Sequence, residues 1–277
     1  MSADSIFTAL IAFLFLLLGL AWGAVMNWFA GSVTEEGELR LKWPACAKCG
    51  AKRTAKSLVP LLGYFMTGGR CPGCREALPA RVPVVEAVTG MLFAALYLIY
   101  GLSWTLLILL LYATVLIVLF VTDLENFILP NVVTYPSILL AALVALAVTL
   151  THYRLPWALF FAGNGFMAIF NNFILCALAG GICGALLLLL VVVLSRGGMG
   201  LGDVVLAGLL GFMVGFPMVF IALFLGILAG GIIAAALLIS RRKKRKEMIP
   251  FGPFLCLGGM LTLLWGREIL GWYLGLM

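Results

Sequence analysis

Long apolar runs recur along almost the whole chain, and they constrain its fold more than any other feature of the sequence. A run of about 20 apolar residues crosses the hydrocarbon core of a bilayer as one α-helix. Because lipid offers no hydrogen-bonding partner, each helix has to satisfy its backbone groups within its own segment. The chain is 64% hydrophobic and only 10% charged. We therefore predict an all-α polytopic membrane protein.

The length and spacing of the apolar runs predict about eight transmembrane helices. The first run, 6–30, is longer than the apolar core of a secretory signal and has no Lys or Arg before it, so we expect it to be retained. We place the aromatic-rich stretch 157–170 in the membrane interface or as an extension of the fifth helix. The other predicted spans are 83–101, 103–122, 130–150, 171–195, 203–216, 217–240 and 252–275.

The basic residues predict how these helices are oriented. Nine of the 18 Lys and Arg residues lie between Arg40 and Arg81, and six form RRKKRK at 241–246. Counting crossings from the first helix places both groups, together with Arg196, on one face, which then carries 16 of the 18. Because cytoplasmic loops are enriched in Lys and Arg, we expect this face to be cytoplasmic and the N-terminus to lie outside.

The same charges indicate the partners and the division of the chain. RRKKRK suits contact with anionic lipid headgroups. Nucleic acid is not an expected partner, because no aromatic-lined soluble domain accompanies the charges. We expect a first transmembrane helix at 1–30, a small cytoplasmic cysteine loop at 31–82 and a transmembrane core at 83–277.

The cysteine loop contains two C-x-x-C pairs, CAKC at 46–49 and CPGC at 71–74. Each pair can form a tight turn that directs two thiolates at one ion, and two such turns complete a tetrahedral site. Four sulfur ligands leave no position for a reacting water, so we predict a structural zinc ion. Disulfides or redox chemistry are the alternatives, which a reducing cytosol disfavours. The four candidate ligands are Cys46, Cys49, Cys71 and Cys74.

Two acidic residues, Asp123 and Asp203, lie at ends of predicted helices. An ionised Asp at the centre of a membrane helix costs about 2.5–3.5 kcal/mol, so such residues usually have a partner or a task. Both helix ends face the cytoplasm in the predicted topology, which allows the two carboxylates to meet. Two carboxylates that share a site can hold one proton between them. One can then activate a water while the other protonates a scissile carbonyl.

Glycines before Asp203 fit this chemistry, since Gly198, Gly200 and Gly202 permit unusual backbone angles and close approach by a peptide strand. Other interpretations stay open at this point. Asp203 also suits a helix N-cap, and Asp123 suits a charge at the membrane interface. The same pair also suits a cation or proton pathway in a secondary transporter.

Several motifs together resemble one protein family. GMGLGD at 198–203 resembles the GxGD signature of intramembrane aspartyl proteases, and the whole chain is similar to type IV prepilin peptidases, also called leader peptidases with N-methyltransferase activity. The similarity runs from about residue 23 to residue 260, in family order. Besides the two C-x-x-C pairs, its blocks are WGAVMNW at 22–28, VPLLGYFMTGGRCPGC at 59–74, RVPVVEAVTG at 81–90, DLENFILPN at 123–131, GMGLGDVVLAGLLG at 198–211 and IPFGPFL at 249–255.

The resemblance implies that Asp123 and Asp203 are the two catalytic aspartates of an intramembrane endopeptidase. Such enzymes remove a short basic leader from prepilin or pseudopilin precursors, typically between Gly and Phe, at the cytoplasmic face of the bacterial inner membrane. In many members the new N-terminus is then methylated, with S-adenosylmethionine as the methyl donor. Type IV pilus biogenesis or type II secretion would be the setting.

The chain departs from the family pattern in two stretches associated with methyl transfer. GAVMNWFAGSV at 23–33 lacks the usual serine and the basic residue after it, and SLVPLLGY at 57–64 lacks an acid and a serine. Methylation is therefore a less direct implication than the peptidase activity. Glu86 does match a family glutamate, for which the resemblance implies a structural or methyltransferase-related role.

Overall fold

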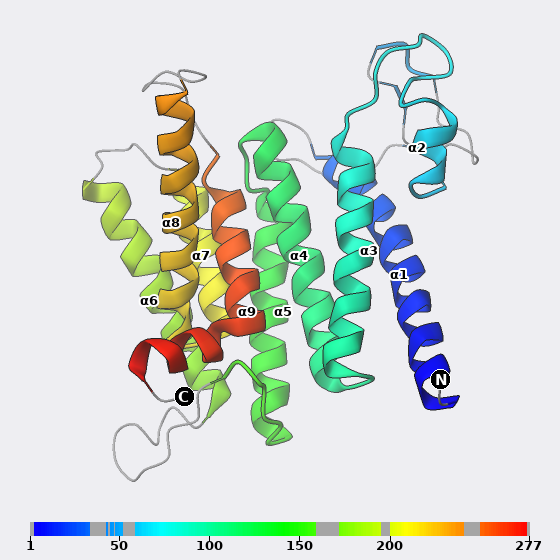
Figure 1. Cartoon of the computed structure of the whole chain (residues 1–277). Helices are drawn as coiled ribbons and strands as arrows, with labels where there is room; N and C mark the ends of the chain where they lie inside the picture. The colour runs from blue at the N-terminus through cyan, green and yellow to red at the C-terminus, as the bar shows by residue number, and fades with distance from the viewer. Residues whose placement is uncertain are drawn as a thin grey trace. The chain divides into compact units, whose positions relative to one another are not determined.

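The computed structural model describes residues 3–33, 43, 45–46, 48–51, 59–158, 172–194, 200–240 and 250–275. Regular structure in these ranges is helical (Figure 1), apart from isolated bridges such as that between Arg70 and Ala77. The helices are α1 (Ala3–Ala30), α2 (Leu62–Met66), α3 (Arg81–Tyr100), α4 (Trp104–Asn126), α5 (Asn131–Leu150), α6 (Phe173–Leu194), α7 (Leu201–Val214), α8 (Met218–Ile239) and α9 (Gly252–Leu274).

The predicted all-α membrane fold is confirmed within these ranges. Seven helices are long and apolar enough to cross a membrane. The eighth apolar helix, α7, has only 14 residues. At 1.5 Å per residue it is about 21 Å long, which is shorter than the hydrocarbon core. Of the aromatic-rich stretch 157–170, residues 159–170 lie outside the described residues.

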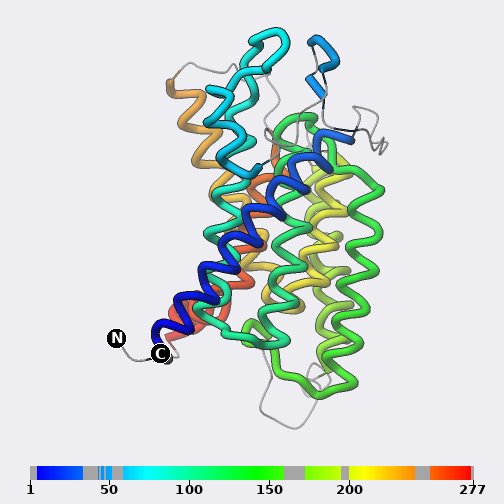
Figure 2. Tube along the Cα trace, turned by 90° about the vertical axis from the view of Figure 1, so that its right-hand side faces the viewer, coloured from blue at the N-terminus to red at the C-terminus, as the bar shows by residue number. Residues whose placement is uncertain are grey.

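The chain forms two compact units, residues 1–118 and 119–277, and α4 passes from the first into the second. In the first unit, α1 packs along α3. The two helices are neighbours in Figure 1, and in Figure 2 α1 crosses α3 at an angle. Glycines allow this close approach, because a Cβ atom on Gly19 would lie 2.8 Å from Gly90 Cα. The Trp22 indole N–H donates to Thr114 Oγ1 of α4 at 3.0 Å.

In the second unit, α7 is held by close contact with α6. A Cβ atom on Gly180 of α6 would lie 2.5 Å from the carbonyl oxygen of Gly211 on α7. Helices α8 and α9 meet in the same way at Gly226 and Gly258. Small residues let helix backbones approach closely in a membrane, where van der Waals packing rather than water drives helix association. This packing determines where the first turns of α7 and α9 lie.

Candidate functional site

Asp123 lies in the last turn of α4, where the chain leaves the helix. The Phe127 N–H donates to the Asp123 carbonyl at 3.0 Å, and Phe127 then takes a left-handed φ of 55°. The Asp123 side chain is buried, with 6% exposure. Its Oδ2 has no hydrogen-bond partner among the described residues. The helix end therefore holds a buried carboxylate with one oxygen left for a proton, a water or a substrate.

Asp203 lies in the first turn of α7 and is also buried, with 9% exposure. Gly200, not Asp203, is the N-cap residue. The Asp203 N–H donates to the Gly200 carbonyl at 3.2 Å, and the Gly200 backbone N–H interacts with the Asp203 carboxyl group. An acidic side chain at the third helical position that reaches back to the N-cap N–H is one half of a capping box. Asp203 thus stabilises the start of α7 without being its cap.

The structure brings these two carboxylates together, since Asp123 and Asp203 lie within electrostatic range of each other. They come from opposite ends of different helices, the last turn of α4 and the first turn of α7. The thiol of Cys256, in the second turn of α9, lies within range of both. Three helix ends therefore surround one acidic centre in the second unit.

Gly252, the first residue of α9, lies directly against Asp123. Its backbone N–H interacts with the Asp123 carboxyl group. A Cβ atom on Gly252 would lie 2.7 Å from Asp123 Oδ2 and 3.0 Å from its Cγ, so only glycine lets α9 begin this close to the acid. Gly252 is absent from the site predicted from sequence. The available signal was IPFGPFL, where this glycine precedes a proline at a helix start.

The glycines before Asp203 differ in their surroundings. Among the described residues, a Cβ atom on Gly200 would have only Asp203 Oδ2 and the Gly202 backbone nitrogen near it, both at 3.9 Å. Gly202 instead packs against Leu129, whose Cβ would lie 3.4 Å from a Cβ atom on this glycine. Gly198 lies outside the described residues. Open space beside the acid therefore remains at Gly200.

The two C-x-x-C pairs in the first unit fold into matching turns. The Gly50 N–H donates to the Cys46 carbonyl at 2.9 Å, and the Arg75 N–H donates to the Cys71 carbonyl at 2.9 Å. Gly50 and Arg75 occupy the same place in each turn and have left-handed φ angles of 70° and 57°. In each turn the first cysteine sulfur also accepts the backbone N–H groups two and three residues later.

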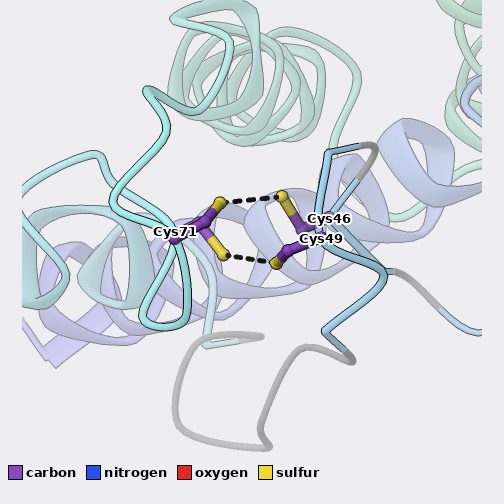
Figure 3. Close-up of side chains that lie close together, drawn as sticks. Cys46, Cys49 and Cys71 are labelled. Atoms are coloured by element: carbon purple, nitrogen blue, oxygen red, sulfur yellow. Dashed lines mark hydrogen bonds between the residues drawn. The ribbon is translucent and has the colours of Figure 1, made fainter.

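The turns direct their sulfur atoms at one another (Figure 3). The Sγ atoms of Cys46 and Cys74 are 3.6 Å apart, and those of Cys49 and Cys71 are 3.8 Å apart. All four lie within 4.8 Å of one another, and the cysteines are free. Tetrahedral zinc with Zn–S bonds of about 2.3 Å would place its sulfur atoms about 3.8 Å apart. The cluster therefore fits one tetrahedral metal ion.

Backbone groups prepare this cluster for a cation. The N–H groups of its own turn lower the pKa of the Cys46 thiol to about 6, and the equivalent groups lower the pKa of Cys71. The Glu76 backbone N–H also acts to lower the pKa of Cys74, but desolvation and the three neighbouring thiols outweigh it and raise that pKa to about 12. Thiolates are thus available to begin binding, and a bound metal would displace the remaining protons.

Glu86, in the second turn of α3, is a buried carboxylate of the first unit, with 5% exposure. Its Oε2 accepts the Leu61 backbone N–H at 2.7 Å, and Leu61 has a left-handed φ of 57°. On the side of α1, a Cβ atom on Gly23 would lie 2.8 Å from Glu86 Cα. Nearby, Asn27 Nδ2 donates to the Val82 carbonyl at 3.0 Å. These polar groups gather where α1 ends and α3 begins.

Comparisons with known proteins identify relatives of this chain. Residues 17–100 match the model of the Bacterial Peptidase A24 N-terminal domain, and residues 108–235 match that of the Type IV leader peptidase family. The chain is 30% identical to a prepilin leader peptidase/N-methyltransferase of Aeromonas salmonicida, over 94% of this chain and 86% of that protein.

Proteins with the same name from other bacteria are similarly related. The one from Aeromonas hydrophila is 32% identical over 83% of this chain and 73% of its own length. The one from Pseudomonas aeruginosa is 30% identical over 83% of this chain and 74% of its own length. No solved structure matches the chain. The similarity to these relatives covers both units, and the chain therefore belongs to the type IV leader peptidase family.

Proposed function

We propose that this peptidase is an intramembrane aspartic endopeptidase that removes the basic leader from prepilin-like or pseudopilin-like precursors at the cytoplasmic membrane face. The observation that carries the proposal is the pair of buried carboxylates, Asp123 and Asp203, within electrostatic range at two helix ends. Membership in a peptidase family favours hydrolysis over a cation pathway for this pair. The basic loops favour an orientation with the cysteine loop in the cytoplasm and the N-terminus outside.

In the proposed reaction, a water molecule lies between the two carboxylates. The ionised carboxylate accepts a proton from this water as its oxygen attacks the scissile carbonyl carbon, and the protonated partner donates its proton to the carbonyl oxygen. The C–N bond then breaks, the leaving amine takes a proton from the first carboxyl group, and the partner carboxylate takes back a proton from one hydroxyl of the tetrahedral intermediate, which becomes the new carboxyl group. Asp123 Oδ2, which has no hydrogen-bond partner in the described part of the chain, is a suitable atom for contact with this water.

The space beside Asp203 also supports cleavage at the aspartate pair. A peptide bond in a helix is shielded by its own hydrogen bonds, so the segment to be cleaved has to be extended at the site. Within the described part of the chain, Gly200 leaves open space beside Asp203, and Gly200 precedes the helix in an extended conformation. We propose that the substrate backbone passes this side of Asp203, where no side chain of Gly200 stands in its way.

The first unit is proposed to methylate the new N-terminus, with S-adenosylmethionine as donor. Support comes from the relatives, whose names include N-methyltransferase, and from the match of residues 17–100 to the family's N-terminal domain. Glu86 and Asn27 lie in this unit as buried polar residues. The methyl group would move from the donor sulfur to the free amine, which loses a proton.

The cysteine cluster is proposed to hold a structural zinc ion. Its four sulfur atoms have the spacing of a tetrahedral site. An ion pair between Lys48 Nζ and Glu76 Oε2, at 2.6 Å, also joins the two turns. A metal would supply this small loop with the cross-link that its few buried apolar side chains do not provide.

Removing either carboxyl group tests the aspartate pair. We expect Asp123→Asn and Asp203→Asn each to lower kcat for cleavage of a purified prepilin at least about 100-fold, because loss of a general acid or base usually costs 10² to 10⁴. Cleavage is measured by the mobility shift of the substrate. Glu125→Gln is the matched control, since Glu125 is an exposed carboxylate at the same end of α4. Cleavage at the normal rate by either aspartate variant would contradict the mechanism.

A second variant tests the approach of α9 to Asp123. Gly252→Ala should lower kcat about tenfold or more with KM changed less than about twofold, because the new methyl group displaces a reacting carboxylate and not the substrate. Steady-state cleavage kinetics provide both constants. Gly231→Ala, where a Cβ atom meets no described residue within 4 Å, should leave both unchanged. Equal kinetics for the two variants would show that Gly252 does not position Asp123.

Methyl transfer can be separated from cleavage by supplying a pilin that has already lost its leader. With S-adenosylmethionine present, we expect both the unchanged protein and Asp203→Asn to add a methyl group to its N-terminus, because Asp203 lies outside the unit proposed to carry this activity. Mass spectrometry of the mature N-terminal peptide measures the product. An unmodified N-terminus with the unchanged protein would contradict the methyltransferase proposal.

Metal analysis of the purified protein tests the zinc site. We expect one zinc ion per chain, and its loss when Cys71→Ser and Cys74→Ser are combined, because two sulfur ligands cannot complete a tetrahedral site. Cys183→Ser is the control, since Cys183 lies in α6 and should leave the zinc content unchanged. A protein with no zinc and four titratable thiols in the loop would exclude the site.

A further inference from the structure

Helix α2 and Val59, three residues before the helix begins, present apolar side chains that the proposed reaction does not use. Val59, Leu62, Phe65 and Met66 are 45%, 62%, 69% and 74% exposed. The other side of α2 packs within the loop, where a Cβ atom on Gly69 would lie 2.9 Å from the Tyr64 ring. Leu62, Phe65 and Met66 share one side of α2 by their spacing of three and four residues, and together with Val59 they form a patch that water disfavours.

A hydrogen bond sets the level of α2 along α3. The Leu61 N–H donates to Glu86 Oε2 at 2.7 Å, and Glu86 is the sixth residue of α3. At 1.5 Å per residue, the Cα atom of Glu86 lies about 7.5 Å along α3 from its start, and its side chain leans back toward that start. Figure 1 shows α2 at the level of the first turns of α3. Because the 20 residues of α3 just span a bilayer core, α2 begins inside the membrane boundary.

Helix α3 presents lipid-facing side chains at this level. Val84 and Val88, on either side of Glu86 in the sequence, are 57% and 48% exposed. Exposed apolar residues on a membrane-spanning helix are in contact with lipid. The apolar side of α2 therefore lies in the same layer as a surface that lipid already covers.

We propose that α2 is an interfacial membrane anchor. Its apolar patch inserts between the lipid headgroups and the upper acyl chains, and consists of Val59, Leu62, Phe65 and Met66. Helices that lie in this interface bury their apolar face about 5–10 Å deep, which matches the level of the Leu61–Glu86 bond. The occupant of the patch is thus the bilayer itself. The anchor does not depend on the reaction proposed above.

Glu86 then has a defined role in the anchor. The first N–H groups of a helix have no partner within it, and an unsatisfied N–H at membrane depth costs several kcal/mol. Glu86 accepts the N–H of Leu61, the residue before α2, while its own burial shields the carboxylate from lipid. Helix α2 lies between the two cysteine turns in the sequence. The Leu61–Glu86 hydrogen bond therefore also holds the cysteine loop at the membrane surface.

A photoreactive lipid tests the anchor directly. The full chain is placed, without any prepilin, in vesicles of phosphatidylethanolamine and phosphatidylglycerol that contain a phospholipid with a diazirine on its acyl chain. After irradiation and trypsin digestion, peptide 57–70 carries α2, and peptide 76–81 is a control from the same loop. We expect at least about tenfold more lipid adducts on 57–70, and more from a diazirine near the headgroup than near the chain end.

Matched variants distinguish the anchor from general exposure. Phe65→Ser combined with Met66→Ser should lower the adducts on 57–70 about fivefold, whereas Phe65→Leu with Met66→Leu should keep them. Glu86→Ala should lower them too, and Glu86→Gln, which retains an acceptor oxygen, should restore them. Equal adducts on 57–70 and 76–81 would overturn the proposal. This result is expected if the apolar patch binds a prepilin and not lipid, because no prepilin is present in the vesicles. Normal labelling of Glu86→Ala would overturn the role of Glu86.

Discussion

A bilayer core has no water to satisfy a polar group, and this constraint explains where the buried acids of the chain lie. In the ranges that the structure describes, each buried carboxylate lies next to a backbone N–H at the start of a helix, where that N–H has no partner within the helix. The three pairs are Asp123 with Gly252, Asp203 with Gly200, and Glu86 with Leu61. Both groups of each pair would be costly alone in lipid, so each satisfies the other. Helix starts also carry a partial positive charge, which favours an acid there.

Close packing of helix backbones brings these helix starts to the acids. Gly180 and Gly211 let α6 and α7 touch at their main chains, and Gly226 and Gly258 do the same for α8 and α9. In the first unit, Gly23 lets α1 approach Glu86 on α3. Larger side chains at these points would push the helices apart. Because a hydrogen bond is lost over a shift of about 1 Å, the apolar packing and the polar pairs depend on each other.

Much of this arrangement could be predicted from sequence. Length and hydropathy are sufficient for the apolar helices, and the C-x-x-C spacing is sufficient for the cysteine cluster, because both patterns are local. The approach of Gly252 to Asp123 could not be derived in this way, since it depends on how α9 packs against α7 and α8. The contact between Gly202 and Leu129 could not be predicted from the glycine pattern before Asp203 either. Helix α2 has five residues, too few for a periodic pattern to be recognised.

At the acidic centre, only part of the hydrogen-bonding capacity of each carboxyl group is used to stabilise the fold. Asp203 stabilises the start of α7 through Gly200, a role that it can keep whether or not it holds a proton on its other oxygen. Asp123 interacts with the start of α9, yet its Oδ2 has no partner among the described residues. One contact fixes the orientation of each carboxyl group, and the rest of its hydrogen-bonding capacity is left for a shared proton and a water. A fully satisfied acid would be more stable but would have no atom left with which to react.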